Sequence, residues 1–294
     1  MQNGRGHCVT SVISRTARQF RALPPRPKPG VDADHSPLGS CERAAIRVFA
    51  RFAMNIRSGI NPVMEALRAG APLERILIAR GAGGPRIQEI VDAARKAGVP
   101  VRFEGREALD RVAKNSVHQG VLAFGAPQNY SALSDLTGRE MLVLLDGVED
   151  PHNLGAIARS AHAAGAGGLV IPERRAVGVT DVVLKASAGA LEYLPLARVK
   201  NINSAIEELK EAGYWIYGLD ERGELGYSDV EWNTPSAMVL GAEGHGLHRL
   251  VRERCDVLVR IPMAGEVASL NVSVAAGIVL FDWRRKQSGK QDAG

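Results

Sequence analysis

The sequence predicts an α/β protein in which a small α/β domain precedes a larger domain built on a parallel sheet. Stretches of strand length alternate with amphipathic stretches of helix length from about residue 56 to residue 286. The strands of the second half are apolar throughout, which is typical of a parallel sheet covered on both faces. We expect domains at residues 54–125 and 141–287, joined by the polar, turn-rich linker 126–140 and followed by a tail at 288–294.

In the first domain, helix-like and strand-like stretches alternate from Pro62 onward. Helices begin where apolar residues recur every three or four positions, and strands are short apolar runs bounded by turn residues. The predicted helices are 62–69, 87–97 and 106–114, and the predicted strands are 75–79, 99–103 and 121–124.

The second domain repeats the strand–helix unit more strictly. Its predicted strands are 142–145, 169–171, 215–219, 238–240 and 257–261, and its predicted helices are 154–164, 181–188, 202–212, 247–254 and 271–287. In parallel sheets of this kind, ligands bind beyond the carboxyl ends of the strands. The polar clusters of this sequence fall at those ends.

Composition excludes several classes of protein. The chain has 294 residues, 45 % of them hydrophobic, and no apolar run near the roughly 18 residues that a membrane span requires. Its three cysteines, Cys8, Cys41 and Cys255, are widely spaced and form no CxxC pair. We therefore expect a protein of the reducing cytoplasm with no membrane contact, no disulfide framework and no metal site.

The net charge of +5 arises in the N-terminal segment. Residues 1–53 hold nine Lys and Arg against three acids, whereas the remainder holds 28 against 29. The high pI therefore does not indicate that the folded domains bind nucleic acid. The segment is also rich in proline, and three interpretations stay open: a disordered basic arm, an upstream extension of the reading frame with the native start at Met54, and a transit peptide.

Three polar clusters follow predicted strands of the second domain. The first, Asp146–Ser160, contains Asn153, for which helix capping is the simplest interpretation, and Arg159, which interrupts a run of small and apolar residues. The second, 239–246, sets Glu243 among glycines that permit close backbone approach. The third, Ile261–Ser273, crosses from a strand through a small-residue loop into the last helix, and its glycine spacing excludes a nucleotide-binding Gly-rich loop.

Taken together and in order, these clusters resemble the SpoU (TrmH-type) family of RNA ribose 2′-O-methyltransferases, which belongs to the knotted SPOUT class. The matching stretches are 150–156 with Arg159, 241–244, and 261–263 through 269–275. The first domain, with its closing residues 118–121, resembles the substrate-binding domain of the RlmB-like branch, whose members methylate a guanosine of 23S rRNA. The resemblance covers about residues 56–286.

The resemblance implies a deep trefoil knot, a known exception to the rule that chains are unknotted. It also implies bound S-adenosylmethionine (SAM) and a homodimer. The residues expected to contact the cofactor are Leu240, Gly241, Gly244, Ile261, Met263 and Leu270. Those expected at the reacting atoms are Asn153, Arg159, Glu243 and Asn271. Because a guanidinium stays charged, we expect Arg159 to stabilise the developing alkoxide or hold phosphate, not to act as a base; Glu243 is the alternative proton acceptor.

RNA is the expected partner, with the first domain as its binding arm. The side chains that we expect to reach RNA are Arg57, Arg80, Arg86, Lys114, His118 and Gln119. Two other functions stay open. One is the same reaction on tRNA or at another rRNA site; the other is a non-catalytic RNA-binding or ribosome-assembly protein on the same fold. The basic run Arg284–Lys286 is expected to follow the last helix as a solubilising end.

Overall fold

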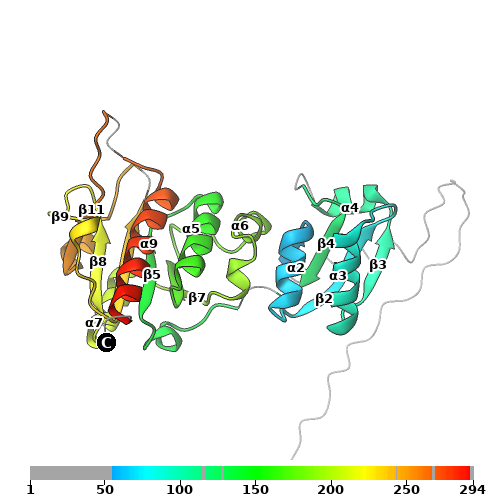
Figure 1. Cartoon of the computed structure of the whole chain (residues 1–294), viewed down its shortest axis with the longest axis horizontal. Helices are drawn as coiled ribbons and strands as arrows, with labels where there is room; N and C mark the ends of the chain where they lie inside the picture. Colours follow the sequence, from blue (N-terminus) through cyan, green and yellow to red (C-terminus); the bar gives the residue numbers. More distant parts are fainter. Residues whose placement is uncertain (1–54, 114–116, 127–128, 243, 267–268, 292–294) are drawn as a thin grey trace, which may run out of the picture. The chain divides into compact units, whose positions relative to one another are not determined.

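The structure is a computed structural model that describes residues 55–113, 117–126, 129–242, 244–266 and 269–291 (Figure 1). The expectations for residues 1–53, Lys114 and Glu243 lie outside these described residues. Within them, no helix is long and apolar enough to cross a membrane.

The first domain is a four-stranded mixed sheet with three helices. Strand β4 pairs antiparallel with β1 and β2, while β2 pairs parallel with β3, giving the order β1-β4-β2-β3. Helix α2 buries Val63, Ala66 and Leu67, which recur at helical spacing and so form one apolar face. The elements are β1 (Asn55–Ser58), α2 (Ile60–Arg68), β2 (Leu73–Ala79), α3 (Pro85–Lys96), β3 (Val101–Glu104), α4 (Arg106–Ala113) and β4 (Val121–Gly125).

The second domain is built on a seven-stranded sheet in the order β7-β6-β5-β10-β8-β11-β9, in which every printed pairing is parallel. The parallel sheet predicted from the sequence is confirmed. Its strands are β5 (Met141–Asp146), β6 (Gly168–Pro172), β7 (Leu196–Val199), β8 (Trp215–Leu219), β9 (Leu225–Gly226), β10 (Ser236–Gly241) and β11 (Val257–Arg260). Its helices are α5 (Pro151–Ala164), α6 (Asp181–Ala186), α7 (Ile202–Glu211), α8 (Arg249–Arg254) and α9 (Val272–Gln291), with short 3-10 turns η2 (Leu133–Leu136), η3 (Ala190–Glu192) and η4 (Tyr227–Asp229).

The central strands of the sheet are buried on both faces because apolar residues occupy nearly every position of β5, β6 and β10. In β5, Met141, Val143 and Leu145 pack into the cluster that contains α5 and α9, whereas Leu142 and Leu144 pack into the cluster that contains α7 and α8. Successive side chains of a strand point to opposite faces, so a continuous apolar run supplies two cores.

The segment 126–140 adds to the second of these cores. Its turn η2 buries Leu133 and Leu136 against the α7 side of the sheet, and Ser131 forms a bridge to Ala197. The sequence predicted a linker here and no element, because a single 3-10 turn is too short to show a periodic pattern of apolar residues.

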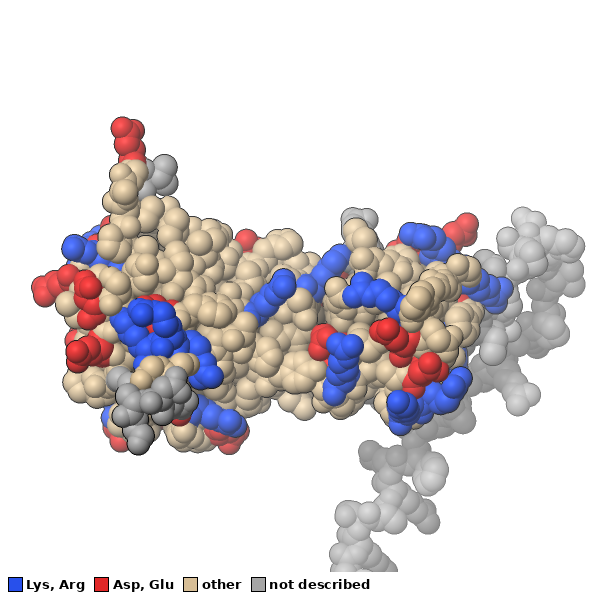
Figure 2. Space-filling view, viewed as in Figure 1, with Lys and Arg blue, Asp and Glu red and all other residues tan. Residues whose placement is uncertain are grey.

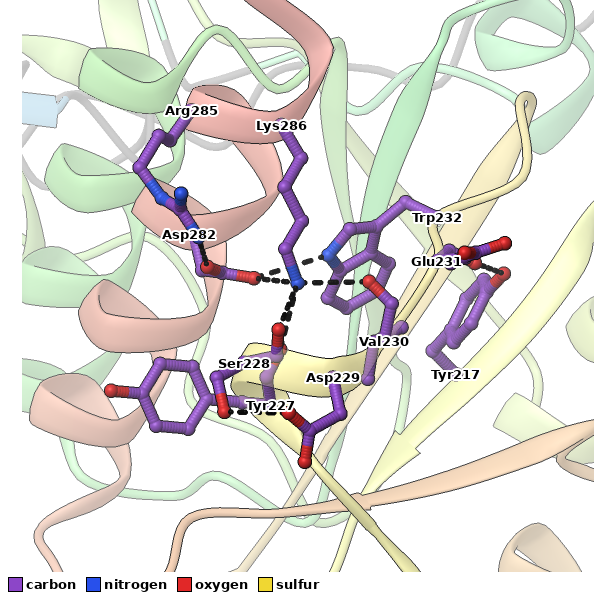
Figure 3. Close-up of polar contacts among 10 residues, drawn as sticks. All are labelled: Tyr217, Tyr227, Ser228, Asp229, Val230, Glu231, Trp232, Asp282, Arg285 and Lys286. Carbon is purple, nitrogen blue, oxygen red and sulfur yellow. Dashed lines mark hydrogen bonds and ion pairs between the residues drawn. The ribbon is translucent and has the colours of Figure 1, made fainter. Parts of the chain in front are cut away.

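The end of α9 is fastened to the loop around η4 (Figure 3). Lys286 donates to the carbonyl oxygens of Tyr227, Ser228 and Val230, and its Nζ lies 2.8 Å from Asp282 Oδ2. Helix α9 continues to Gln291, so the expectation that the basic run follows the helix is wrong. Lys286 therefore has a structural role. Its side chain is largely buried, whereas the side chains of Arg284 and Arg285 are exposed.

Candidate active site at the carboxyl edge of the sheet

The three polar clusters meet at the carboxyl edge of the parallel sheet. Strands β5, β10 and β11 end at Asp146, Gly241 and Arg260, and the loops that follow them line two adjoining cavities. The topology thereby brings together residues that are more than 100 positions apart in the sequence, as expected for ligand sites of parallel sheets.

Asn153 and Asn271 are joined directly. The Nδ2 atom of Asn271 donates to Oδ1 of Asn153 at 2.9 Å. Asn271 also caps α9, since its Oδ1 accepts from the backbone amide of Ser273 at 2.9 Å. Each amide therefore fixes the orientation of the other at the start of its helix.

The capping interpretation of Asn153 is wrong. Asp150 occupies the N-cap of α5 and accepts from the backbone amide of His152 at 2.9 Å. Asn153 lies three residues further on and is 5 % exposed. A buried amide in this position needs hydrogen-bond partners, and Asn271 supplies one.

Gly241 is required by a close backbone approach. A Cβ atom built there would lie 2.1 Å from the carbonyl carbon of Gly246. The chain folds back at this point, because Ala242 and Gly246 exchange backbone hydrogen bonds of 3.1 and 3.0 Å. The glycine-rich cluster is thus a closed loop held against the end of β10.

The first cavity, called here the Leu270 cavity, has a volume of about 340 Å³. Four of the six residues expected at the cofactor line it: Gly244, Ile261, Met263 and Leu270. Leu240 and Gly241 do not; Leu240 is buried in the core and Gly241 shapes the loop. Asp220 and Glu221 also line this cavity, and both directly follow β8. The sequence analysis did not single them out, although a polar pair after an apolar strand is the same signal that marked the other clusters.

The second cavity, called here the Asn153 cavity, has a volume of about 410 Å³ and shares Ala242, His245 and Val272 with the first. Glu149, Asp150, Asn153, Arg175 and His248 all contribute to its lining. Arg175 and His248 were not among the predicted site residues. Arg175 follows β6 and His248 follows the glycine-rich loop, so both come from connections at the same edge of the sheet.

Arg159 lies apart from both cavities. Its side chain is exposed on α5, and it belongs to the lining of neither cavity. Six residues separate it from Asn153, which at about 100° per residue places the two side chains roughly 120° apart around the helix. Within one chain, Arg159 and Asn153, both predicted at the reacting atoms, are therefore not brought together.

Two of the residues expected to bind RNA are buried instead. Arg57 is 2 % exposed and pairs with Glu192, the Nε to Oε1 distance being 2.5 Å. His118 is 4 % exposed, with its Nε2 2.7 Å from Asp110 and its Nδ1 accepting from the Gly120 amide. The expectation of a phosphate contact is wrong for both. Arg80 and Arg86 are exposed, and Gln119 accepts from the Ile60 amide at 3.2 Å.

Cys255 is a half-buried free cysteine. Burial, with a smaller contribution from Asp256, raises the pKa of the Cys255 thiol to about 12. A thiol with this pKa is not a nucleophile at neutral pH. The described residues also hold no group of three or more His, Cys, Asp or Glu side chains placed to bind a metal ion.

Comparison with known proteins identifies the family. Residues 140–281 match the SpoU rRNA Methylase family, and residues 58–131 match the family described as RNA 2'-O ribose methyltransferase substrate binding. The chain is 42 % identical over 237 residues to YacO of Bacillus subtilis, which is assigned to the TrmH family of tRNA/rRNA methyltransferases; the match covers 78 % of this chain and 95 % of YacO. The chain belongs to the SpoU/TrmH family of RNA methyltransferases.

Solved structures agree with this assignment. An AdoMet-bound rRNA methyltransferase from Sinorhizobium meliloti matches with a TM-score of 0.69 at 27 % identity, over 83 % of this chain and 90 % of that one. The SpoU methyltransferase AviRb from Streptomyces viridochromogenes, in complex with AdoMet, matches with a TM-score of 0.68 at 28 % identity, over 83 % and 93 %. The resemblance drawn from the sequence is confirmed at the level of the family and its two-domain α/β fold.

Proposed function

We propose that this protein transfers the methyl group of SAM to the ribose 2′-OH of a guanosine in 23S rRNA. The observation that carries the proposal is the convergence of the three family motifs on two adjoining cavities at the carboxyl edge of the sheet. The RlmB-like first domain, which matches the substrate-binding family, supports RNA as the substrate.

The Leu270 cavity fits the cofactor. Its volume lies within the roughly 300–1,000 Å³ typical of small-molecule sites. Ile261 and Leu270 offer apolar contact and backbone groups to an adenosine. Asp220, Glu221 and Arg222 offer charges of both signs, which suit the ammonium and carboxylate groups of the cofactor's methionine end. SAM bound here supplies a methyl group that is already activated for transfer.

The Asn153 cavity fits the ribose. Transfer requires the 2′ oxygen in line with the methyl group, at roughly 3–3.5 Å from its carbon. Because Asn153 is locked by Asn271, its amide is a rigid element against which a ribose can be oriented. The shared residues Ala242, His245 and Val272 mark where the methyl group passes between the two cavities.

Arg159 completes the site from a second copy of the chain. Figure 2 shows a mainly uncharged surface over α5 and α9, which ends at basic side chains near the end of α9. On α9, Val274 and Phe281 are each 51 % exposed and lie seven residues apart, so they share one face of the helix. Such an apolar stripe suits a helix-packed dimer interface. Arg159, exposed on α5, would then reach the partner's Asn153 cavity.

A methylation assay tests the reaction and the substrate. Purified protein is incubated with methyl-labelled SAM and either a 23S rRNA transcript or a pool of tRNA transcripts, and the modified nucleotide is mapped by mass spectrometry of nuclease fragments. We expect 2′-O-methylguanosine in the 23S transcript alone. Label in tRNA would move the substrate to the alternative suggested by relatives named as tRNA/rRNA methyltransferases.

A subunit-mixing experiment tests the role of Arg159. Arg159→Ala and Asn153→Ala should each lower methyl transfer at least a hundredfold as homodimers. If Arg159 acts on the partner's site, co-expressed mixed dimers contain one intact site and should recover up to half of the wild-type rate. Normal activity of Arg159→Ala alone, or no recovery on mixing, contradicts the assignment.

Two further features belong to the proposal. The chain forms the trefoil knot of its class and works in the cytoplasm as a homodimer. A non-catalytic RNA-binding role stays as the distant alternative, and failure to bind SAM in calorimetry would favour it. The pairing of Asn153 with Asn271 argues for an enzyme, because an RNA-binding scaffold has no need for two interlocked amides at a small-molecule cavity.

A further inference from the structure

His248 and Asp146 form a hydrogen-bonded pair at the Asn153 cavity. The Nδ1 atom of His248 lies 2.9 Å from Oδ2 of Asp146, and the backbone amide of His248 donates to the same oxygen at 2.9 Å. Asp146 is the last residue of β5 and is 7 % exposed, so its carboxylate is held in place by the sheet. Asp146 thereby holds both the backbone and, through Nδ1, the imidazole of His248.

This arrangement selects one form of the ring. An ionised carboxylate only accepts hydrogen bonds, so the proton of a neutral His248 ring lies on Nδ1. The Nε2 atom then carries a lone pair. Arg175, whose guanidinium only donates, approaches Nε2 to 3.5 Å, which is consistent with an unprotonated nitrogen.

The His248 ring packs against a glycine and faces the Asn153 cavity. Gly147 packs beneath it with φ of 87°, and a Cβ atom at this position would lie 3.3 Å from Cε1 of His248. The His248 side chain is 47 % exposed and belongs to the cavity lining together with Asn153.

We infer that His248 accepts the proton of the ribose 2′-OH during methyl transfer, and that Asp146 positions it. The inference rests on the function proposed above. In the step, the 2′ oxygen forms a bond to the methyl carbon while the bond from that carbon to sulfur breaks, and the 2′ proton passes to Nε2. The sulfonium charge is lost as the imidazolium charge appears, so the charge balances.

Charged groups lie at both ring nitrogens. Asp146 lies at Nδ1, and Nη1 of Arg175 lies 3.5 Å from Nε2. Glu149, Asp150 and His245 line the same cavity. Arg175 also has a left-handed backbone with φ of 58°, an uncommon conformation for a residue with a side chain and one that clusters at functional sites.

The test compares pH–rate profiles of the wild-type protein and His248→Asn, whose amide can still donate to Asp146 but has no group at the position of Nε2. We expect kcat to fall about a hundredfold, the typical contribution of general base catalysis. The fall in activity on the acid side should also disappear, while the Kd for SAM and the KM for RNA stay within about twofold. Unchanged kcat, or an acid limb that persists in the variant, overturns the inference.

A measurement without cofactor or RNA separates this inference from the proposed function. Long-range ¹H–¹⁵N spectra of histidine-labelled protein report which ring nitrogen carries the proton. We expect His248 with its proton on Nδ1 near neutral pH, and loss of that preference in Asp146→Asn. A proton on Nε2 in the wild type overturns the inference, whereas absence of methyl transfer to every RNA by the wild type overturns the proposed function instead.

Discussion

The two adjoining cavities differ in what builds them, and the difference separates binding from chemistry. The Leu270 cavity combines apolar side chains and a glycine-rich loop, whose backbone folds on itself, with the charged residues Asp220, Glu221 and Arg222 at one strand end. The Asn153 cavity is lined by amide, carboxylate, imidazole and guanidinium groups, of which Asn153 and His248 are held by hydrogen bonds to Asn271 and Asp146. A cavity of the first kind recognises shape and apolar surface, whereas one of the second kind orients a substrate and moves a proton.

Of the variants that separate the two cavities, Gly241→Ala should give the largest effect, mainly on the Leu270 cavity, although Ala242 and His245 of the same loop also line the Asn153 cavity. The added Cβ meets the backbone of Gly246, which cannot move without opening the hydrogen bonds between Ala242 and Gly246. We expect SAM binding to weaken at least tenfold in calorimetry. Gly265→Ala is the matched control, since Gly265 has open space around its Cα and no positive φ. Equal affinity in both variants would show that the loop does not shape the cofactor site.

Asn271→Ser should affect mainly the Asn153 cavity. Serine keeps the cap of α9, but it cannot donate to Asn153 as the amide does. We expect a melting temperature within a few degrees of the wild type and methyl transfer reduced roughly tenfold. Asn271→Ala loses the cap as well, and we expect it to cost a further ~1 kcal/mol of stability in denaturant unfolding. A Ser variant with full activity would show that the interlocked amides serve only the fold.

The position of both cavities could be predicted from the sequence, because buried parallel strands appear as continuous apolar runs. The apolar runs, such as 142–145, predicted a doubly covered sheet, and the sheet in turn predicted that the residues after β5, β10 and β11 meet. Asn153 and Asn271 were found through the family motif. Their hydrogen bond was not, because no local pattern reports a contact across 118 residues.

The burial of Arg57 and His118 and the role of His248 could not be predicted from the sequence. In the sequence, Arg57 and His118 look like surface cations, yet both are buried. Arg57 contacts the carboxylate of Glu192, which is distant in the sequence, and His118 contacts that of Asp110 on α4. Burial of a charged side chain depends on a partner, and the partner is set by tertiary structure. His248 was missed for the same reason, since its role is visible only once Asp146 faces it.

Lys286→Met should have the smallest effect on SAM binding and methyl transfer, because it lowers stability without touching either cavity. It changes the far end of α9, the helix whose first turns line the cavities through Val272 and Ala275. The variant leaves three carbonyl oxygens without their charged donor, and we expect a loss of about 2 kcal/mol in denaturant unfolding. Arg284→Met is the control, because it removes the same charge from an exposed position.

The pH dependence of this difference follows from Asp282. Burial opposes ionisation of its carboxyl, but hydrogen bonds from Lys286 and Arg285 outweigh burial and lower the pKa of Asp282 below its ordinary value. A carboxyl with a lowered pKa in the folded state stabilises the fold above about pH 4, and this contribution disappears as the pH falls further. The stability gap between the wild type and Lys286→Met should therefore narrow in acid, while SAM affinity per folded molecule stays equal at pH 7. A change in that affinity would mean that the cavities are not independent of the anchored end of α9.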